Sequence, residues 1–159
     1  LFQIIDWDLS QLDASAAFAE VSISLTRLTD ATLESAISVA TQELIREGRI
    51  SEADASPCPL AVIAMGKTGA QELNYVSDVD VIYVATEAEK IDTAIKIATR
   101  MQAVIYDVEV EPGLWQVDPN LRPEGKSGVL VRTLEAHVAY YDKWAEPWEF
   151  GRQARVSGR

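Results

Sequence analysis

Two aspartates separated by one apolar residue, Asp78 and Asp80, are the residues of this sequence best suited to chemistry. They stand in Ser77-Asp-Val-Asp80, where a run of β-branched and aromatic residues begins and predicts a strand. Side chains alternate between the two faces of a strand, so both carboxylates are expected on one face. Two like charges at that spacing repel unless a cation lies between them, and Mg²⁺ or Mn²⁺ suits carboxylates combined with substrate phosphates.

A third acid, Asp118, ends residues 114–118, which also read as a strand. If these strands are neighbours, the three carboxylates form a metal cage that can hold phosphates during an in-line displacement at phosphorus. The alternative is that Asp78 and Asp80 are solvated residues at a strand edge, because this short motif is common. Burial is favoured by the apolar neighbours of the pair, which are Val76, Val79, Val81 and Ile82.

A glycine turn, Gly66-Lys67-Thr68-Gly69, directly follows an apolar run. A P-loop is rejected, because it needs a glycine where Ala61 stands. The turn is either an ordinary tight turn or a place where the backbone approaches a nucleotide phosphate. Lys67 is then either a phosphate contact or a surface lysine. Ser77 could orient Asp78 or a nucleotide oxygen, or it could simply end the loop.

The elements that must position these residues follow from hydrophobic spacing. Residues 1–48 contain no proline, and no glycine before Gly48, so they are predicted to be helical, with Thr29 or Asp30 capping a helix from near Ala31. Strands are predicted at residues 60–65, 79–84 and 114–118, and helices at residues 88–106 and 134–144. A helical turn is predicted near residues 70–73. Ile95 is among the residues on the apolar stripe of the helix at 88–106. This order predicts an α+β fold with a small sheet covered by helices.

Composition narrows the class of protein further. The chain has 159 residues, 48% of them apolar, and a net charge of −11, so it is expected to be globular and not to bind nucleic acid. The single cysteine, Cys58, is expected to be a reduced structural or loop thiol. No apolar run approaches the length of a membrane span, and no basic region precedes an apolar stretch at the N-terminus, so a cytoplasmic location without membrane contact is expected.

Residues 60–84, 117–128 and 134–150 together resemble the family of glutamine synthetase adenylyltransferases and deadenylylases of bacteria. The resemblance implies a nucleotidyltransferase fold, a small mixed sheet with helices, and an enzyme that acts on a tyrosine of glutamine synthetase. The segment Glu72-Leu-Asn-Tyr-Val-Ser-Asp-Val-Asp80 looks like the half that removes AMP by phosphorolysis and releases ADP. The alternatives are adenylyl transfer from ATP, and a non-catalytic fragment that binds glutamine synthetase or a nitrogen-signalling regulatory protein.

Carried over by position, the resemblance implies catalytic and metal-binding roles for Asp78, Asp80 and Asp118, with Mg²⁺ or Mn²⁺. It implies that the phosphates of ATP or ADP are bordered by Gly66, Lys67, Ser77 and Arg122. The guanidinium of Arg122 suits either a phosphate or a bracing contact with Glu124. His137, in a predicted helix, is expected to be a packing or surface residue.

Three parts of the chain are predicted. Residues 1–50 form a helical leader, and residues 58–150 form the nucleotidyltransferase core. Residues 151–159 are basic and contain glycine and serine, and they depart from the pattern of the family, so they are predicted to be a disordered or aberrant tail.

Overall fold

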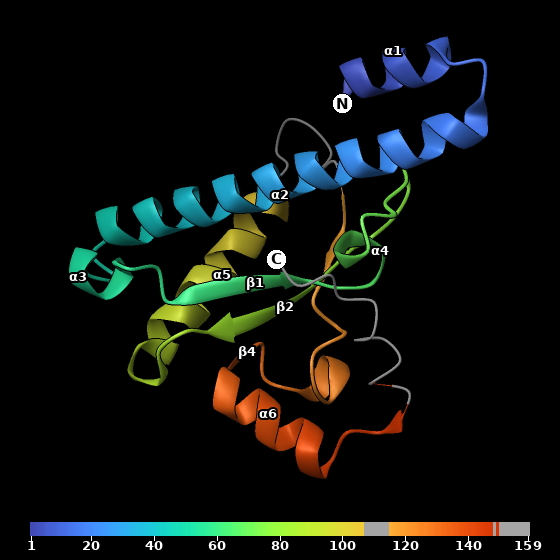
Figure 1. Cartoon of the computed structure of the whole chain (residues 1–159). Coiled ribbons are helices and arrows are strands. Elements are labelled where there is room, and N and C mark those ends of the chain that lie inside the picture. Colours follow the sequence, from blue (N-terminus) through green and yellow to red (C-terminus); the bar gives the residue numbers. More distant parts are fainter. Residues whose placement is uncertain (107–114, 148, 150–159) are drawn as a thin grey trace.

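The computed structural model describes residues 1–106, 115–147 and 149, and Figure 1 shows how its elements are arranged. The helices are α1 (Phe2–Ser10), α2 (Ala14–Arg46), α3 (Glu52–Ala55), α4 (Gly66–Gly69), α5 (Ile91–Tyr106) and α6 (Leu134–Lys143), with 3-10 turns η1 (Ala88–Lys90) and η2 (Gly125–Ser127). The strands are β1 (Leu60–Ala64), β2 (Val79–Ala85), β3 (Val117–Asp118) and β4 (Val131–Thr133). The predicted α+β class, with a small mixed sheet after a helical segment, is therefore confirmed. The predicted tail at 151–159 lies outside the described residues.

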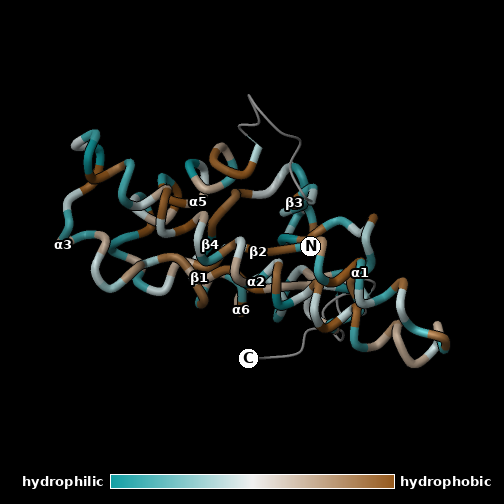
Figure 2. The backbone as a smooth tube through the Cα atoms, turned by 90° about the horizontal axis from the view of Figure 1, so that it is seen from above, coloured by the Kyte–Doolittle hydropathy of each residue, from teal (hydrophilic) through white to brown (hydrophobic). Residues whose placement is uncertain are grey.

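Strand β2 is the centre of the sheet, and each of the other strands in the described residues pairs with it. β1 runs antiparallel to β2, whereas β3 and β4 run parallel to it. β4 pairs with the second half of β2 and β3 pairs with its first two residues, so the chain leaves the sheet after Asp118 and returns at Val131. Figure 2, which looks down on the molecule, shows β2 coloured as hydrophobic between β1 and β3.

One face of the sheet is covered by α2 and α5, and this contact forms the main hydrophobic core. Alternate residues of β2 point into it, and the buried side of α5 meets them. The buried residues that form the core include Leu33, Ala40, Leu44, Val79, Val81, Tyr83, Ile97, Met101, Val117 and Val131. The second half of α2 therefore belongs to the same core as the strands, and burying apolar surface there stabilises both.

Helix α2 begins much earlier than the sequence suggested. Its N-cap is Asp13, whose Oδ1 accepts hydrogen bonds from the backbone N–H groups of Ser15 and Ala16 at 3.0 and 3.2 Å. The expected start near Ala31 is wrong, because the hydroxyl of Thr29 bonds back to the carbonyl of Leu25 inside a continuous helix. Among the described residues, no helix combines the length and apolar character needed to cross a membrane.

Other differences from the expected elements are local. The helical turn lies at α4 and not near residues 70–73. Helix α5 with η1 matches the predicted helix, and Ala98 and Met101 of the expected stripe are buried. Ile95 is 38% exposed, however, and Ala94 and Ile97 are buried instead. Within the described residues, strand β3 is only two residues long, and β4 was not predicted at all.

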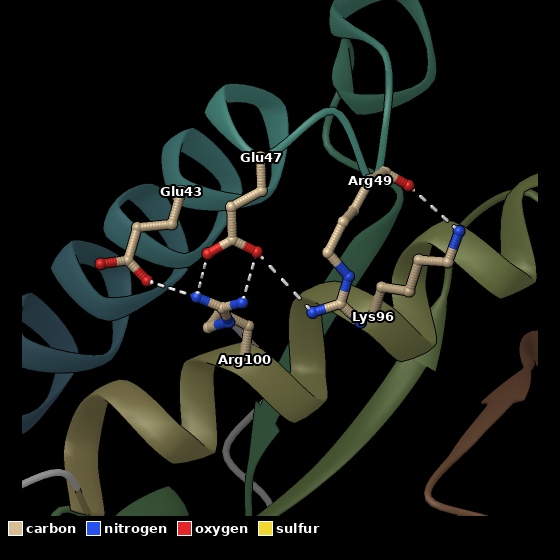
Figure 3. Close-up of polar contacts among 5 residues, drawn as sticks. All are labelled: Glu43, Glu47, Arg49, Lys96 and Arg100. Carbon is tan, nitrogen blue, oxygen red and sulfur yellow. Dashed lines mark hydrogen bonds and ion pairs between the residues drawn. The ribbon is translucent and has the colours of Figure 1, made fainter.

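A cluster of charged side chains joins α2 to α5 on the surface (Figure 3). The guanidinium of Arg100 donates to both carboxylate oxygens of Glu47 at 2.6 and 2.9 Å, and to Glu43 at 3.0 Å. Lys96 on the same helix donates to the carbonyl of Arg49 at 3.2 Å. The bidentate contact from Arg100 lowers the pKa of Glu47, and this pair joins the C-cap of α2 to α5.

Replacing Arg100 with methionine is expected to lower the melting temperature by about 2 °C in low salt, since exposed ion pairs contribute modestly. Folding lowers the pKa of Glu47 below its ordinary value of 4.5. The stabilisation by its pair with Arg100 is therefore fully present above pH 4.5, and it disappears as the pH falls through the pKa that Glu47 has in the folded state. The matched change Arg49→Met removes only a 3.8 Å contact with Glu47 and should have less effect. Differential scanning fluorimetry at several salt concentrations and pH values measures the melting temperatures of both variants. The prediction is contradicted if the difference in melting temperature between them is as large at pH 3 or in 1 M salt as it is in low salt at neutral pH.

Candidate active site

Asp80 and Asp118 lie opposite each other across the pair of strands β2 and β3. The strands are parallel, and their register pairs Val79 with Val117 and Asp80 with Asp118. Both valines are buried in the core beneath α2 and α5, so alternation directs the two aspartates to the other face of the sheet. Adjacent strands are about 4.8 Å apart, so the fold brings these two predicted site residues together from distant parts of the chain.

Asp78 lies one residue before β2 and is exposed. Burial is the main cause that raises the pKa of Tyr106, and the carboxylates of Asp118 and Asp78 raise it further. Because Asp78 immediately precedes β2, it lies at the end of this strand where Asp80 pairs with Asp118. The expectation that apolar neighbours enclose the aspartates is wrong on one side, because Val76 is 91% exposed, whereas Val79 is fully buried.

The donor set suits a hard divalent cation such as Mg²⁺ or Mn²⁺. Asp80 and Asp118 offer carboxylate oxygens from adjacent strands, and Mg²⁺ usually takes one or two carboxylates and completes its shell with water and substrate phosphates. Within the described ranges, no three His, Cys, Asp or Glu side chains form a group that could hold an ion. Asp78 as a third ligand stays a prediction, and the pair Asp80 and Asp118 is the part of the expected cage that the fold assembles.

Gly66 lies directly against the carboxylate of Asp80. Its φ is +52°, and a Cβ at this position would be 2.5 Å from Oδ2 of Asp80. The backbone N–H of Met65 also donates to the carbonyl of Asp80 at 2.9 Å, so the turn and the acid are fixed together. Only glycine satisfies both the backbone angle and the space. Lys67, the next residue of this turn, is exposed, and its contact with a phosphate stays a prediction.

Ser77 closes the loop that precedes Asp78. Its Oγ accepts a hydrogen bond from the N–H of Asn74 at 3.2 Å, and its own N–H donates to the carbonyl of Asn74 at 3.2 Å. The side chain of Asn74 in turn accepts from the N–H of Val76 at 3.0 Å. These bonds support the simpler of the two roles considered, in which Ser77 ends the loop and so sets where β2 begins. A contact between Ser77 and a nucleotide stays a prediction.

Arg122 braces the loop between β3 and β4. Its guanidinium donates to the carbonyls of Pro119, Lys126 and Gly128 at 2.9, 3.1 and 3.0 Å. The expected partner Glu124 bonds instead to Arg132 at 2.8 Å, so that contact was predicted wrongly. The bracing alternative is what the structure shows for Arg122, and a phosphate contact stays a prediction.

Sequence reasoning overlooked three residues that fix Asp118 and its loop. The N–H of Asn120 donates to Oδ1 of Asp118 at 2.8 Å, a turn that the spacing Asp-Pro-Asn could have indicated. Tyr106 donates a hydrogen bond to the carbonyl of Val117. A Cβ on Gly128 would be 2.0 Å from the carbonyl oxygen of Pro123, so this loop also requires glycine there. No local signal in the sequence marks the last two.

His137 and Cys58 lie outside the candidate site. His137 is buried in α6, and burial lowers its pKa, so it remains neutral at pH 7 as a packing residue. Cys58 is an exposed, free thiol in the segment that leads into β1, as expected of a loop cysteine.

The model of the glutamate-ammonia ligase adenylyltransferase family matches residues 3–159. A bifunctional glutamine synthetase adenylyltransferase/adenylyl-removing enzyme of Leifsonia xyli subsp. xyli is 48% identical, and the match covers 100% of this chain and 17% of the relative. Proteins of the same name from Streptomyces coelicolor and Bifidobacterium longum subsp. infantis are 48% and 44% identical, over 89% and 100% of this chain but only 14% and 15% of their own lengths.

The chain thus spans about a sixth of the length of these curated relatives, and it matches the part toward their N-terminal end. The resemblance expected from residues 60–84, 117–128 and 134–150 is confirmed, since the family model extends over all three segments. This chain belongs to the glutamate-ammonia ligase adenylyltransferase family.

Proposed function

We propose that this chain carries a nucleotidyl-transfer centre that removes AMP from the adenylylated tyrosine of glutamine synthetase by phosphorolysis. The observation that carries the proposal is the pairing of Asp80 with Asp118 on one face of the sheet, directly against the Gly66 turn. Two carboxylates beside a glycine backbone are what a site for a divalent cation and a phosphate group needs. Membership of a family whose relatives are named for adenylyl transfer and removal supports this chemistry.

In phosphorolysis, an oxygen of inorganic phosphate attacks the phosphorus of the tyrosine–AMP ester. The new P–O bond gives ADP, the bond to the tyrosine oxygen breaks, and that oxygen takes up a proton. A bound Mg²⁺ or Mn²⁺ would supply positive charge to the phosphoryl oxygens. Asp80 and Asp118, with Asp78, would hold it, the Gly66 turn would border the phosphates, and Lys67 would offset their charge.

The direction of the reaction is proposed from the segment that ends at Asp80. Residues 72–80 resemble the adenylyl-removing half of the family, and the matched part of the relatives lies toward their N-terminal end. The names of the relatives also include adenylyl transfer, so transfer of AMP from ATP is the second candidate. Because the chain spans about a sixth of these relatives, a fragment that only binds glutamine synthetase or a nitrogen-signalling regulatory protein is the third.

One pair of assays separates these functions. The chain is incubated with adenylylated glutamine synthetase, phosphate and Mn²⁺, and separately with unmodified glutamine synthetase, ATP and Mn²⁺. We expect ADP release in the first assay and no incorporation of AMP in the second. Incorporation alone would replace removal by transfer. If neither occurs, and calorimetry detects no Mn²⁺-dependent binding of ADP, the catalytic proposal is overturned in favour of a binding fragment.

A further inference from the structure

Strand β3 is too short to hold itself in place. It contributes two residues to the sheet, and the backbone N–H of Val79 extends its pairing by one bond, to the carbonyl of Gln116 at 2.9 Å. Yet the pairing of this strand with β2 is what places Asp118 opposite Asp80. A strand of this length needs contacts from outside the sheet, and one of them comes from the end of α5.

Tyr106 is the last residue of α5, and its hydroxyl donates a hydrogen bond to the carbonyl of Val117. That carbonyl belongs to the same rigid peptide unit as the nitrogen of Asp118. A bond to it therefore restricts rotation of the peptide plane that leads into Asp118, and so restricts the direction of the Asp118 side chain. Helix α5 is a firm base for this contact, because Ile97 and Met101 are fully buried in the core.

We propose that Tyr106 is a positioning residue, whose hydroxyl sets the direction of Asp118 toward Asp80 through the Val117 carbonyl. Asn120 completes the arrangement from the other side, since its N–H holds Oδ1 of Asp118 at 2.8 Å. One contact fixes the backbone and the other fixes the carboxylate. The proposal rests on the proposed function in so far as Asp118 holds a cation, but the positioning itself can be tested without one.

The surroundings of Tyr106 agree with a role as hydrogen-bond donor. Burial raises the pKa of its phenol, the nearby carboxylates of Asp118 and Asp78 raise it further, and the bond to Val117 acts in the opposite direction. The hydroxyl therefore keeps its proton at neutral pH and remains available to donate. Its bond to the Val117 carbonyl, one residue before Asp118, places the hydroxyl beside the candidate site without making it a ligand.

The test is Tyr106→Phe in the full chain, with Tyr75→Phe as the matched control. Tyr75 also loses one hydroxyl bond, to Oδ2 of Asp8 at 3.0 Å, but that bond joins the loop before β2 to α1 and not to the backbone of β3. Without metal, we expect amide hydrogen exchange of Val79 and Asn120 to be faster by about tenfold in Tyr106→Phe only. With Mn²⁺ alone as the probe, electron paramagnetic resonance should show a dissociation constant raised by about tenfold in Tyr106→Phe only.

The outcomes separate this proposal from the proposed function. If exchange at Val79 and Asn120 is unchanged in Tyr106→Phe, the positioning role is overturned, whatever happens to Mn²⁺. If exchange is faster but the wild-type chain binds no Mn²⁺, positioning is supported and the metal site of the proposed function fails. A fall in melting temperature with Mn²⁺ affinity and exchange both as in wild type would show that Tyr106 only contributes to stability.

Discussion

Replacing Asp80 with asparagine is expected to lower ADP release from adenylylated glutamine synthetase by about a thousandfold or more, since it removes a charged metal ligand at the reacting centre. The substitution keeps the size of the side chain and changes one oxygen to an amide, so the strand should fold as before. The melting temperature without metal is therefore expected to stay close to that of the wild type.

The matched control is Asp142→Asn, because Asp142 is an exposed acid on α6 and lies outside the candidate site. It makes the same change of charge, so any general effect of net charge appears in both variants. Initial rates of ADP release and thermal unfolding, with and without Mn²⁺, measure the difference. If Asp80→Asn released ADP as fast as Asp142→Asn, Asp80 would have no catalytic role, and family membership would be the only remaining support for the proposed function.

The central strand and the main helices could be predicted from the sequence because their hydrophobic patterns are long and regular. Strand β2 is rich in β-branched and aromatic residues, and α5 carries apolar residues at helical spacing over four turns. Strand β4 was missed because three residues carry too little pattern, and its formation depends on pairing with β2, which is a tertiary contact. The start of α2 was misplaced because Asp13 and Asp30 are both suitable caps, and only packing decides between them.

The candidate site divides in the same way. Alternation along one strand was enough to select Asp80, and the end of a second apolar stretch was enough to select Asp118. What the sequence could not supply was the register between them, because that is set by Val79 and Val117 packing into the shared core. It also could not show that Tyr106 holds β3, because this bond joins a helix end to a backbone carbonyl, and carbonyls have no sequence signature.

Replacing Gly66 with alanine is expected to abolish ADP release as fully as loss of Asp80 does, although no charged group is removed. Two effects add together. A residue with a Cβ costs about 1–2 kcal/mol at φ +52°, and the new methyl group would lie 2.5 Å from Oδ2 of Asp80, closer than such atoms approach. The carboxylate must rotate away or β2 must shift, and either movement takes Asp80 out of line with Asp118.

Gly48→Ala is the control that isolates the second effect. Gly48 follows the end of α2 with φ +68°, and nothing lies within 4 Å of the position where its Cβ would be. It therefore carries the same strain of the backbone, about 1–2 kcal/mol, without a clash. We expect both variants to lose stability in chemical denaturation, Gly66→Ala the more, and only Gly66→Ala to lose Mn²⁺ binding and ADP release. Equal effects of the two substitutions on Mn²⁺ binding would mean that strain alone is responsible, and that the contact between Gly66 and the Asp80 carboxylate has no part in forming the site.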